Sequence, residues 1–311
     1  MKLCYIFTGQ GTQRQGMLKT IIDRYSCVKE VFEVASEYAK IDVKKLCMDG
    51  SEEELRRTIN TQIAVTTMNM SFYRILQEDG VRPDICLGHS LGQLSAAAAS
   101  GVYCLEDLFR IVVKRAYLMD SSKDRGVLCS IIGADIDVVQ DICDKVNCSR
   151  ANINIALHNT NNQIVIGGKE ECIEEFSKEI KKRQRVIIKQ LNVSNAFHTP
   201  LMSFMGSDFS EFLNKIQFNE LNVPMLLNCS GQYAKDSEDV KNDLIAQCCH
   251  MVKWYECLKR LGSGEDMIAV EVGYGKTMSK MLRDVNKNIP CFPTSEYDSY
   301  NKMLEYINTT K

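Results

Sequence analysis

"DICLGHSLGQLSAAAASG" (residues 84–101) joins a short apolar run, a glycine-flanked serine and an alanine-rich helical pattern. This order is typical of a nucleophile elbow, in which a strand turns tightly into a helix. Gly88 and Gly92 stand on either side of Ser90 because the backbone nearly folds on itself there. We expect the Ser90 hydroxyl to face a substrate and the Leu91 N–H, at the start of the helix, to stabilise an oxyanion. A turn that carries an incidental serine fits the same pattern.

The composition is that of an ordinary globular protein. Of 311 residues, 45% are hydrophobic and 25% charged, and the net charge of −2 argues against partners such as nucleic acid or an anionic membrane. No apolar run has the length of a membrane span, and the start, "MKLCYIFTGQ", is interpreted as a strand rather than a signal peptide. The 14 cysteines include no C-x-x-C pair, which predicts reduced thiols in a cytoplasmic protein without a metal site.

Strand-like and helical patterns alternate along the chain, which predicts an α/β fold with a mainly parallel sheet. Strands are expected at 3–7 and 84–88, helices at 91–101 and 105–119, and a further strand at 267–275 that runs into a turn. In an open parallel sheet the loops at the carboxyl ends of the strands lie at one edge, where ligands bind.

Residues 127–191 show a different order of elements. Four segments are strand-like, and helical patterns follow the first and the third: "VLCSIIG", "INIALH", "QIVIGG" and "RVIIKQLNV". This β-α-β-β-α-β order is the ferredoxin-like pattern. We therefore expect a small domain at 127–192 inserted into a larger α/β domain formed by 1–126 and 193–311, with a cleft at their junction.

A catalytic serine needs a base, and the chain has only four histidines. His89 is next to Ser90, so its side chain should point away from the hydroxyl. His158 ends a predicted strand, and His250 lies in a predicted helix. His198 follows the inserted segment where it rejoins the larger domain, which makes it the best candidate, although a lone histidine is often structural.

A second glycine turn, "TGQGTQ" (8–13), follows the first strand. It should lie at the same sheet edge as the elbow, so the N–H of Gln10 is a candidate for the second oxyanion donor. The turn lacks the third glycine of a dinucleotide fingerprint. "GYGKT" (273–277) lacks the first glycine of a phosphate loop, because Val270 stands there.

Arg115 lies beside Leu108, Val112 and Met119 on the apolar stripe of the helix predicted at 105–119. An arginine there needs a partner, because an unpaired buried charge is costly. A structural salt bridge or a side chain that extends to solvent satisfies this need. A site that binds a substrate carboxylate through two parallel hydrogen bonds satisfies it equally.

Six motifs resemble, in their order, those of the malonyl-CoA:acyl carrier protein transacylases of fatty acid synthesis and the related acyltransferases of polyketide synthases. They cover essentially the whole chain: "GQGTQ", "GHSLG", "KRAYLM", "VSNAFH", "IAQCCHMVKW" and "EVGYGK". The resemblance implies an α/β-hydrolase-like domain with an inserted ferredoxin-like domain, in agreement with the order of elements above.

The resemblance also implies catalytic roles for matching positions. Ser90 would be the acylated nucleophile and His198 its general base. Gln247 would supply the amide oxygen that orients the imidazole, in place of the Asp or Glu of a hydrolase triad. Gln10 and Leu91 would supply the two oxyanion N–H groups.

Substrate-binding roles are implied in the same way. Arg115 would pair with the malonyl carboxylate, and the bulk of Phe197 would crowd an α-methyl group. Met119, His89 and Asn159 complete the expected substrate-binding residues.

The implied reaction is transfer of a malonyl group from malonyl-CoA to the thiol of an acyl carrier protein, in fatty acid or polyketide synthesis. The coenzyme A thioester is the substrate, and neither a cofactor nor a metal is expected in what should be a monomer. Some positions depart from the family pattern, among them Gln93 in place of a glutamate, which suggests a divergent member. An editing acyl hydrolase is the alternative, which Arg115 disfavours, and Ser90 and His198 disfavour a binding module without catalysis.

The segment "KEIKKRQRVIIK" (178–189) holds a run of basic residues that includes Lys181 and Lys182. The carrier protein of the family is acidic, so these lysines are candidates for its docking surface. Cations that stabilise the carboxyl end of a helix explain the run equally well.

Overall fold

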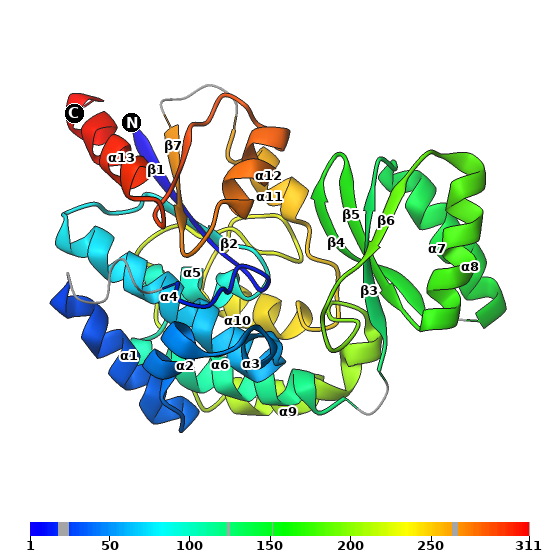
Figure 1. The fold of residues 1–311 in the computed structure, drawn as a ribbon, viewed down its shortest axis with the longest axis horizontal. Coiled ribbons are helices and arrows are strands. Elements are labelled where there is room, and N and C mark those ends of the chain that lie inside the picture. The colour runs from blue at the N-terminus through cyan, green and yellow to red at the C-terminus, as the bar shows by residue number, and fades with distance from the viewer. Residues whose placement is uncertain (18–24, 123–124, 151, 263–266, 311) are drawn as a thin grey trace.

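The computed structural model describes residues 1–17, 25–122, 125–150, 152–262 and 267–310, which form a larger and a smaller sheet (Figure 1). The larger sheet is entirely parallel, with the order β2-β1-β7-β8. Its strands are β1 (Lys2–Phe7), β2 (Ile85–Gly88), β7 (Met267–Val272) and β8 (Cys291–Pro293). The prediction of a mainly parallel sheet is therefore confirmed.

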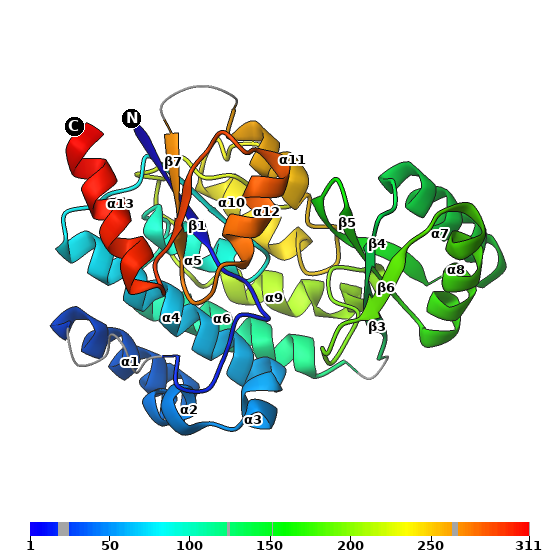
Figure 2. The ribbon, with the colours of Figure 1, turned by 45° about the horizontal axis from the view of Figure 1, so that its top comes forward.

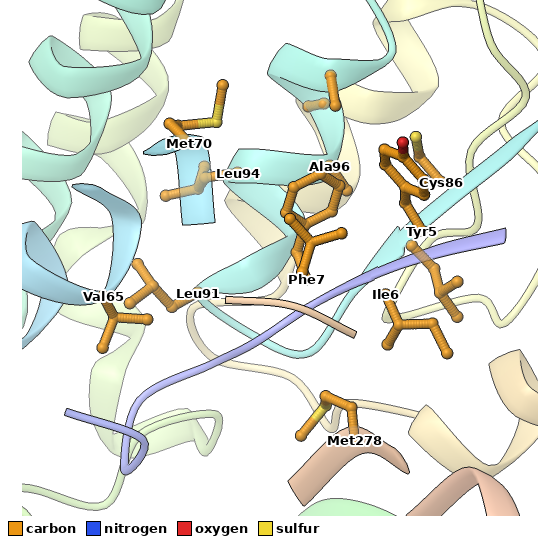
Figure 3. Packing of buried hydrophobic residues seen from close by; sticks show 14 of the residues in the cluster. Tyr5, Ile6, Phe7, Val65, Met70, Cys86, Leu91, Leu94, Ala96 and Met278 are labelled. Carbon is orange, nitrogen blue, oxygen red and sulfur yellow. The ribbon is translucent and has the colours of Figure 1, made fainter. Parts of the chain in front are cut away.

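Helices cover both faces of this sheet, which is why β1 is a nearly continuous apolar run. Tyr5 and Phe7 point toward α5 (Gly92–Ala99), whereas Ile6 points to the opposite face, toward Met278 of α12 (Thr277–Val285) (Figure 3). The long, mostly buried helix α4 (Thr58–Glu78) packs against α5 and also contacts β7. The other helices of this part are α1 (Ser26–Ala39), α2 (Val43–Asp49), α3 (Glu52–Arg56), α6 (Leu105–Asp120), η1 (Pro200–Met205), α9 (Gly206–Leu213), α10 (Ser237–Ala246), α11 (Trp254–Arg260) and α13 (Tyr297–Thr310).

The smaller sheet is antiparallel, with the order β4-β5-β3-β6, and α7 and α8 pack on one of its faces (Figure 1). The elements are β3 (Val127–Ile132), α7 (Ile136–Arg150), β4 (Ile153–Thr160), β5 (Gln163–Gly168), α8 (Glu170–Arg183) and β6 (Ile187–Gln190). Order and pairing are those of the ferredoxin-like fold, as predicted. This sheet has an apolar core of its own. The division at 126/127 and 192/193 remains a prediction.

Main-chain hydrogen bonds join β4 of the smaller sheet to the segment between α10 and α11. The N–H of His158 donates to the carbonyl of Val252 (3.0 Å), and the N–H of Val252 donates to the carbonyl of Ala156 (2.9 Å). The smaller sheet thus lies beside α11, at one end of the molecule (Figure 2). The segment that follows α10 is thereby held between the two sheets.

Candidate active site

Ser90 lies in the tight turn between β2 and α5, as the sequence predicts, with a φ angle of 51°. A Cβ atom on Gly88 would lie 2.1 Å from the carbonyl oxygen of Gly92, and one on Gly92 would lie 2.3 Å from that of Phe7. Both contacts are with backbone, so neither glycine has room for a side chain. The glycines allow β1, β2 and α5 to approach closely enough to form the elbow.

His198, from the segment between β6 and η1, lies beside this serine. Its Nε2 is 2.6 Å from the Ser90 Oγ, and its Nδ1 is 2.6 Å from the main-chain oxygen of Gln247. A carbonyl only accepts, so Nδ1 carries the proton and Nε2 accepts from the serine hydroxyl. The amide oxygen of Gln247 that faces the imidazole is that of the main chain, because the side-chain oxygen accepts from Arg115. The chain turns after α10, and this brings the main-chain carbonyl to the ring instead.

The sequence predicts a helix at His250, but the structure has a turn there. Helix α10 ends at Ala246, and the carbonyls of Gln247 and Cys248 accept from Nδ1 and from the N–H of His198, respectively. A continuing helix would use these carbonyls itself. His250 is exposed at the end of the turn.

The imidazole of His198 is in its neutral form, which is the form that can accept a proton. Burial, helped by the positive charge of Arg115, lowers its pKa from 6.5 to about 3, against the opposing hydrogen bond to the Gln247 carbonyl. The ring is therefore neutral at pH 7 and free to accept the proton of Ser90.

Arg115 is buried on α6, with 2% of its surface exposed. Its Nη1 donates to the Oε1 of Gln62 (2.8 Å) and its Nη2 to the Oε1 of Gln247 (3.0 Å). No carboxylate among the described residues forms an ion pair with it, so neither a structural salt bridge nor extension to solvent accounts for its charge. Burial lowers the pKa of Arg115, against the opposing effect of the neighbouring Cys248 thiol.

Gln62, on α4, was not identified in the sequence. Its amide joins two predicted site residues, because Nε2 donates to the sulfur of Met119 (3.2 Å) while Oε1 accepts from Arg115. The only signal was the number of polar residues in this segment, such as Gln62 and Asn69, which the structure shows to be fully buried. A helix with so many buried polar groups supplies hydrogen bonds to its neighbours.

A buried network of amides also escaped the sequence analysis. The Nε2 of Gln247 donates to the Oε1 of Gln93 (2.6 Å), to the Oδ1 of Asn228 (3.1 Å) and to the carbonyl of Ser90 (3.1 Å). Gln93 and the main chain of Asn228 in turn donate to Asp243. In the sequence, Gln93 stands out only as a departure from a motif. Asn228 and Asp243 carry no local signal that predicts their place in the network.

The two expected oxyanion donors lie on adjoining turns. A Cβ on Gly9 would lie 2.5 Å from the carbonyl oxygen of His89, so the first glycine turn packs on the elbow. Within the described chain, no acceptor takes a hydrogen bond from the main-chain N–H of Gln10 or of Leu91. Their role as oxyanion donors remains a prediction.

The remaining predicted residues surround this centre. The Nε2 of His89 is 2.9 Å from the Oδ1 of Asn159, and its ring stands edge-on to Trp254. This pair links the elbow to β4 of the smaller sheet. The His89 ring thus contacts Asn159, whereas the Ser90 hydroxyl contacts His198. Phe197 is buried next to His198. Substrate binding by these side chains stays a prediction.

Comparison with known proteins agrees with this geometry. The model of a family described as "Acyl transferase domain" matches residues 4–293. The chain belongs to this family. The resemblance inferred from the six motifs is therefore confirmed, and the elbow, His198 and Arg115 all fall inside the matched acyl transferase domain.

Relatives of the acyl transferase domain are similar along almost their whole length. A malonyl CoA-acyl carrier protein transacylase of Bacillus subtilis is 29% identical over 308 residues, which are 98% of this chain and 97% of that protein. One from Staphylococcus aureus is 29% identical over 291 residues, 93% of this chain and 94% of that protein.

Solved structures show the same fold. The malonyl-CoA:acyl carrier protein transacylase of Xanthomonas oryzae has a TM-score of 0.93 at 28% identity, covering 98% of this chain and 99% of that one. That of Clostridium perfringens has a TM-score of 0.91 at 31% identity, covering 100% and 98%. A type II polyketide synthase acyl carrier protein in complex with its malonyl-transacylase has a TM-score of 0.92 at 26% identity, covering 98% and 100%.

Three further observations concern metals, thiols and membranes. Nowhere in the described ranges do three His, Cys, Asp or Glu side chains gather as metal ligands. The cysteines that the structure describes are free thiols. None of the described helices combines the length and the apolar character that a membrane crossing requires.

Proposed function

We propose that this protein transfers a malonyl group from malonyl-CoA to the thiol of an acyl carrier protein, through a malonyl ester of Ser90. One observation carries the proposal: the Ser90–His198 pair, 2.6 Å apart, shares its buried surroundings with a guanidinium that has no carboxylate partner among the described residues. Nucleophile and base together allow acyl transfer, and an unpaired cation favours an acyl group that carries an anion.

In the first half of the reaction, Ser90 is acylated. His198 Nε2 takes the hydroxyl proton as Oγ forms a bond to the thioester carbon. The oxyanion accepts hydrogen bonds from the N–H groups of Gln10 and Leu91. The bond from carbon to sulfur then breaks, and coenzyme A leaves as a thiol with the proton from His198.

The second half reverses these steps with another thiol. The phosphopantetheine thiol of the carrier protein gives its proton to His198 and attacks the ester carbon. The bond from carbon to the Ser90 Oγ breaks, and the imidazolium returns the proton to that oxygen. The malonyl thioester of the carrier protein leaves, and the enzyme is restored. No redox step occurs, so the reaction needs no electron-carrying cofactor.

Selection of the malonyl group is assigned to Arg115 and Phe197. The guanidinium gives two of its donors to amides, Gln62 and Gln247, and has others left for a carboxylate. The buried ring of Phe197, next to the base, leaves little room for an α-methyl substituent. We assign supporting contacts to Met119, His89 and Asn159.

Intact-mass analysis tests the proposal. Wild-type protein incubated with malonyl-CoA should gain one malonyl group, and Ser90→Ala should gain none. Ser203→Ala is the matched control, because this exposed serine of η1 donates its hydroxyl to the carbonyl of Pro200 and forms no hydrogen bond with a site residue in the part of the chain that the structure describes; it should load like wild type. A malonyl adduct on Ser90→Ala would show that another residue is the nucleophile.

The fate of the malonyl-enzyme separates a transferase from a hydrolase. We expect the malonyl group to move to an added acyl carrier protein faster than it is lost to water. Rapid loss to water in the presence of the carrier protein would favour the editing hydrolase instead.

We further propose that the protein acts in the cytoplasm as a monomer, in fatty acid or polyketide synthesis, without a bound cofactor. The acidic carrier protein would dock near the end of α8, where Lys181 is exposed. Lys182 and Arg183 there already pair with Glu179 and Asp141, so part of the basic charge is used within the protein.

A further inference from the structure

Asp243 is a buried carboxylate to which the mechanism above gives no role. It lies on α10 with 6% of its surface exposed. Its Oδ2 accepts from the Nε2 of Gln93 (2.8 Å) and from the N–H of Asn228 (3.0 Å), and its Oδ1 accepts from the N–H of Cys229 (3.0 Å). No cation among the described residues forms an ion pair with it. A buried charge held by neutral donors alone needs a reason, because its desolvation is costly.

The hydrogen bonds of Asp243 continue, in one direction, to Arg115. The Nη2 of Arg115 donates to Gln247, the Nε2 of Gln247 donates to Gln93, and the Nε2 of Gln93 donates to Asp243. A guanidinium has only donors and a carboxylate only acceptors. The two ends therefore determine which way both amides face, and the cation and the anion stabilise each other through them.

A second branch leads from Asp243 to the nucleophile. The carboxylate holds the main-chain N–H of Asn228, whose side-chain Oδ1 accepts from the N–H of Ser90 (2.8 Å) and whose Nδ2 donates to the carbonyl of Gly88 (2.9 Å). The same carboxylate is thus connected to both parts of the site, the elbow and the guanidinium.

We propose that Asp243 is a positioning residue that, through Gln93 and Gln247, orients the guanidinium of Arg115 to receive the carboxylate of the acyl group. The inference rests on the proposed function, since it takes Arg115 as the group that binds that carboxylate. It also accounts for Gln93: a glutamate there would place a second carboxylate 2.8 Å from the first.

Replacement of Asp243 by asparagine removes the anion that determines the direction of the chain of hydrogen bonds. The new amide has one acceptor oxygen where the carboxylate had two, so its amino group faces an N–H donor whichever way the amide turns. When the amino group faces Gln93, Gln93 turns its own amino group toward Gln247, and Arg115 loses its fixed acceptor. We expect Asp243→Asn to lower the preference for malonyl-CoA over acetyl-CoA about tenfold, through a higher KM for malonyl-CoA, while kcat for acetyl loading changes less than about threefold.

A reciprocal exchange distinguishes orientation from mere loss of packing. In the double variant Gln93→Glu with Asp243→Asn, the glutamate accepts from Gln247 on one side and from the new asparagine on the other. The direction of the chain is restored, and we expect the malonyl preference to return to within about threefold of wild type. A structural role of Asp243 alone would leave the double variant no better than Asp243→Asn.

The single variant Gln93→Glu adds a pH readout. Two facing carboxylates hold one proton between them, and the protonated acid supplies the donor that Gln93 supplied. The repulsion between the two carboxylates raises the pKa of the group that holds this proton. The malonyl preference of Gln93→Glu should therefore be present at low pH and decline as pH rises, whereas the preference of wild type should show no such decline. The titratable groups that face Asp243 are the thiols of Cys229 and Cys257, and burial raises the pKa of both so that they stay neutral.

All variants are loaded with malonyl-CoA and acetyl-CoA and weighed intact over time, beside Glu238→Gln. Glu238 is an exposed carboxylate of the same helix that pairs with the surface residue Lys241, so its removal should leave both rates unchanged. Wild type that accepts no malonyl group would refute the proposed function itself. Wild-type loading together with an unchanged preference in Asp243→Asn, or with no recovery in the double variant, would overturn the role of Asp243.

Discussion

The guanidinium of Arg115 and the imidazole of His198 influence each other because both are buried. After burial itself, the Arg115 charge is the largest cause that lowers the pKa of His198. In a poorly polarisable interior such a charge acts over a longer distance than in water. A malonyl carboxylate paired with Arg115 would cancel this effect, so the acyl group and the base are electrostatically coupled.

Arg115→Ala should therefore change both selectivity and pH dependence. The malonyl preference over acetyl should disappear, because the neutral side chain offers nothing to a carboxylate. The pKa of His198 should rise, since one cause of its lowering is removed, and the acid limb of kcat/KM for acetyl-CoA should move to higher pH. A pH series of acetyl loading measures this limb.

The control for this prediction is Arg110→Ala. Arg110 lies on the same helix but is exposed and pairs with Asp107. It should retain the wild-type preference and pH profile. A malonyl preference that survives in Arg115→Ala would place the carboxylate-binding group elsewhere.

Among the secondary-structure elements, short backbone contacts hold the site together. The N–H of His89 donates to the carbonyl of Phe7 on β1, and the elbow glycines allow α5 to approach both strands. At the other edge of β1, Glu271 of β7 accepts from the N–H groups of Met278 and Ser279. A carboxylate there stabilises the N-terminus of α12, and this is the structural role of the "EVGYGK" motif.

Gly88→Ala should unfold much of the protein or shift the elbow. The added Cβ would lie 2.1 Å from the backbone of Gly92. The backbone of Gly92 in turn lies close to that of Phe7, so it cannot move away from the new side chain. We expect a loss of about 3 kcal/mol or more in the free energy of unfolding, measured by urea denaturation.

Gly206→Ala is the matched control for the elbow. A Cβ there meets nothing within 4 Å, and φ is −61°, a helical value. The change should be neutral or stabilising by about 0.5 kcal/mol, because alanine loses less backbone entropy in a helix. Equal losses in both variants would mean that glycine content, not the elbow contact, determines the effect.

For the molecule as a whole, burial of the site also makes stability depend on pH. Burial lowers the pKa of His198 to about 3, and those of His89 and His158 are lowered for the same reason. Below about pH 6.5 the unfolded chain binds protons that the folded protein does not. The stability from these groups is therefore complete above pH 6.5 and decreases as the pH falls toward 3.

His198→Gln isolates one such contribution. Between pH 7.5 and pH 5, wild type should lose about 2 kcal/mol of unfolding free energy relative to this variant, which has no imidazole to titrate. Urea denaturation of both proteins at several pH values gives the difference, in which the effects of all other groups cancel. A difference that is constant across this range would show that His198 titrates alike in both states.

Much of the fold was predictable from local patterns in the chain. The elbow around Ser90, the β-α-β-β-α-β order of 127–191 and the parallel arrangement of the first strand with 84–88 all follow from short stretches of sequence. Hydrophobic periodicity, glycine at tight turns and the short reach of backbone hydrogen bonds act over a few residues. For the same reason Ser90 could be identified as a nucleophile from its neighbours alone.

The partners of these groups follow from the folded molecule. Ser90 meets His198 across 108 positions, and Gln247 orients the imidazole with its main chain rather than its side chain. Pattern alone left Arg115 open between a salt bridge and a substrate site, and it gave Asp243 no role. Folding brings both into one buried network, where each donor must find an acceptor because water is absent.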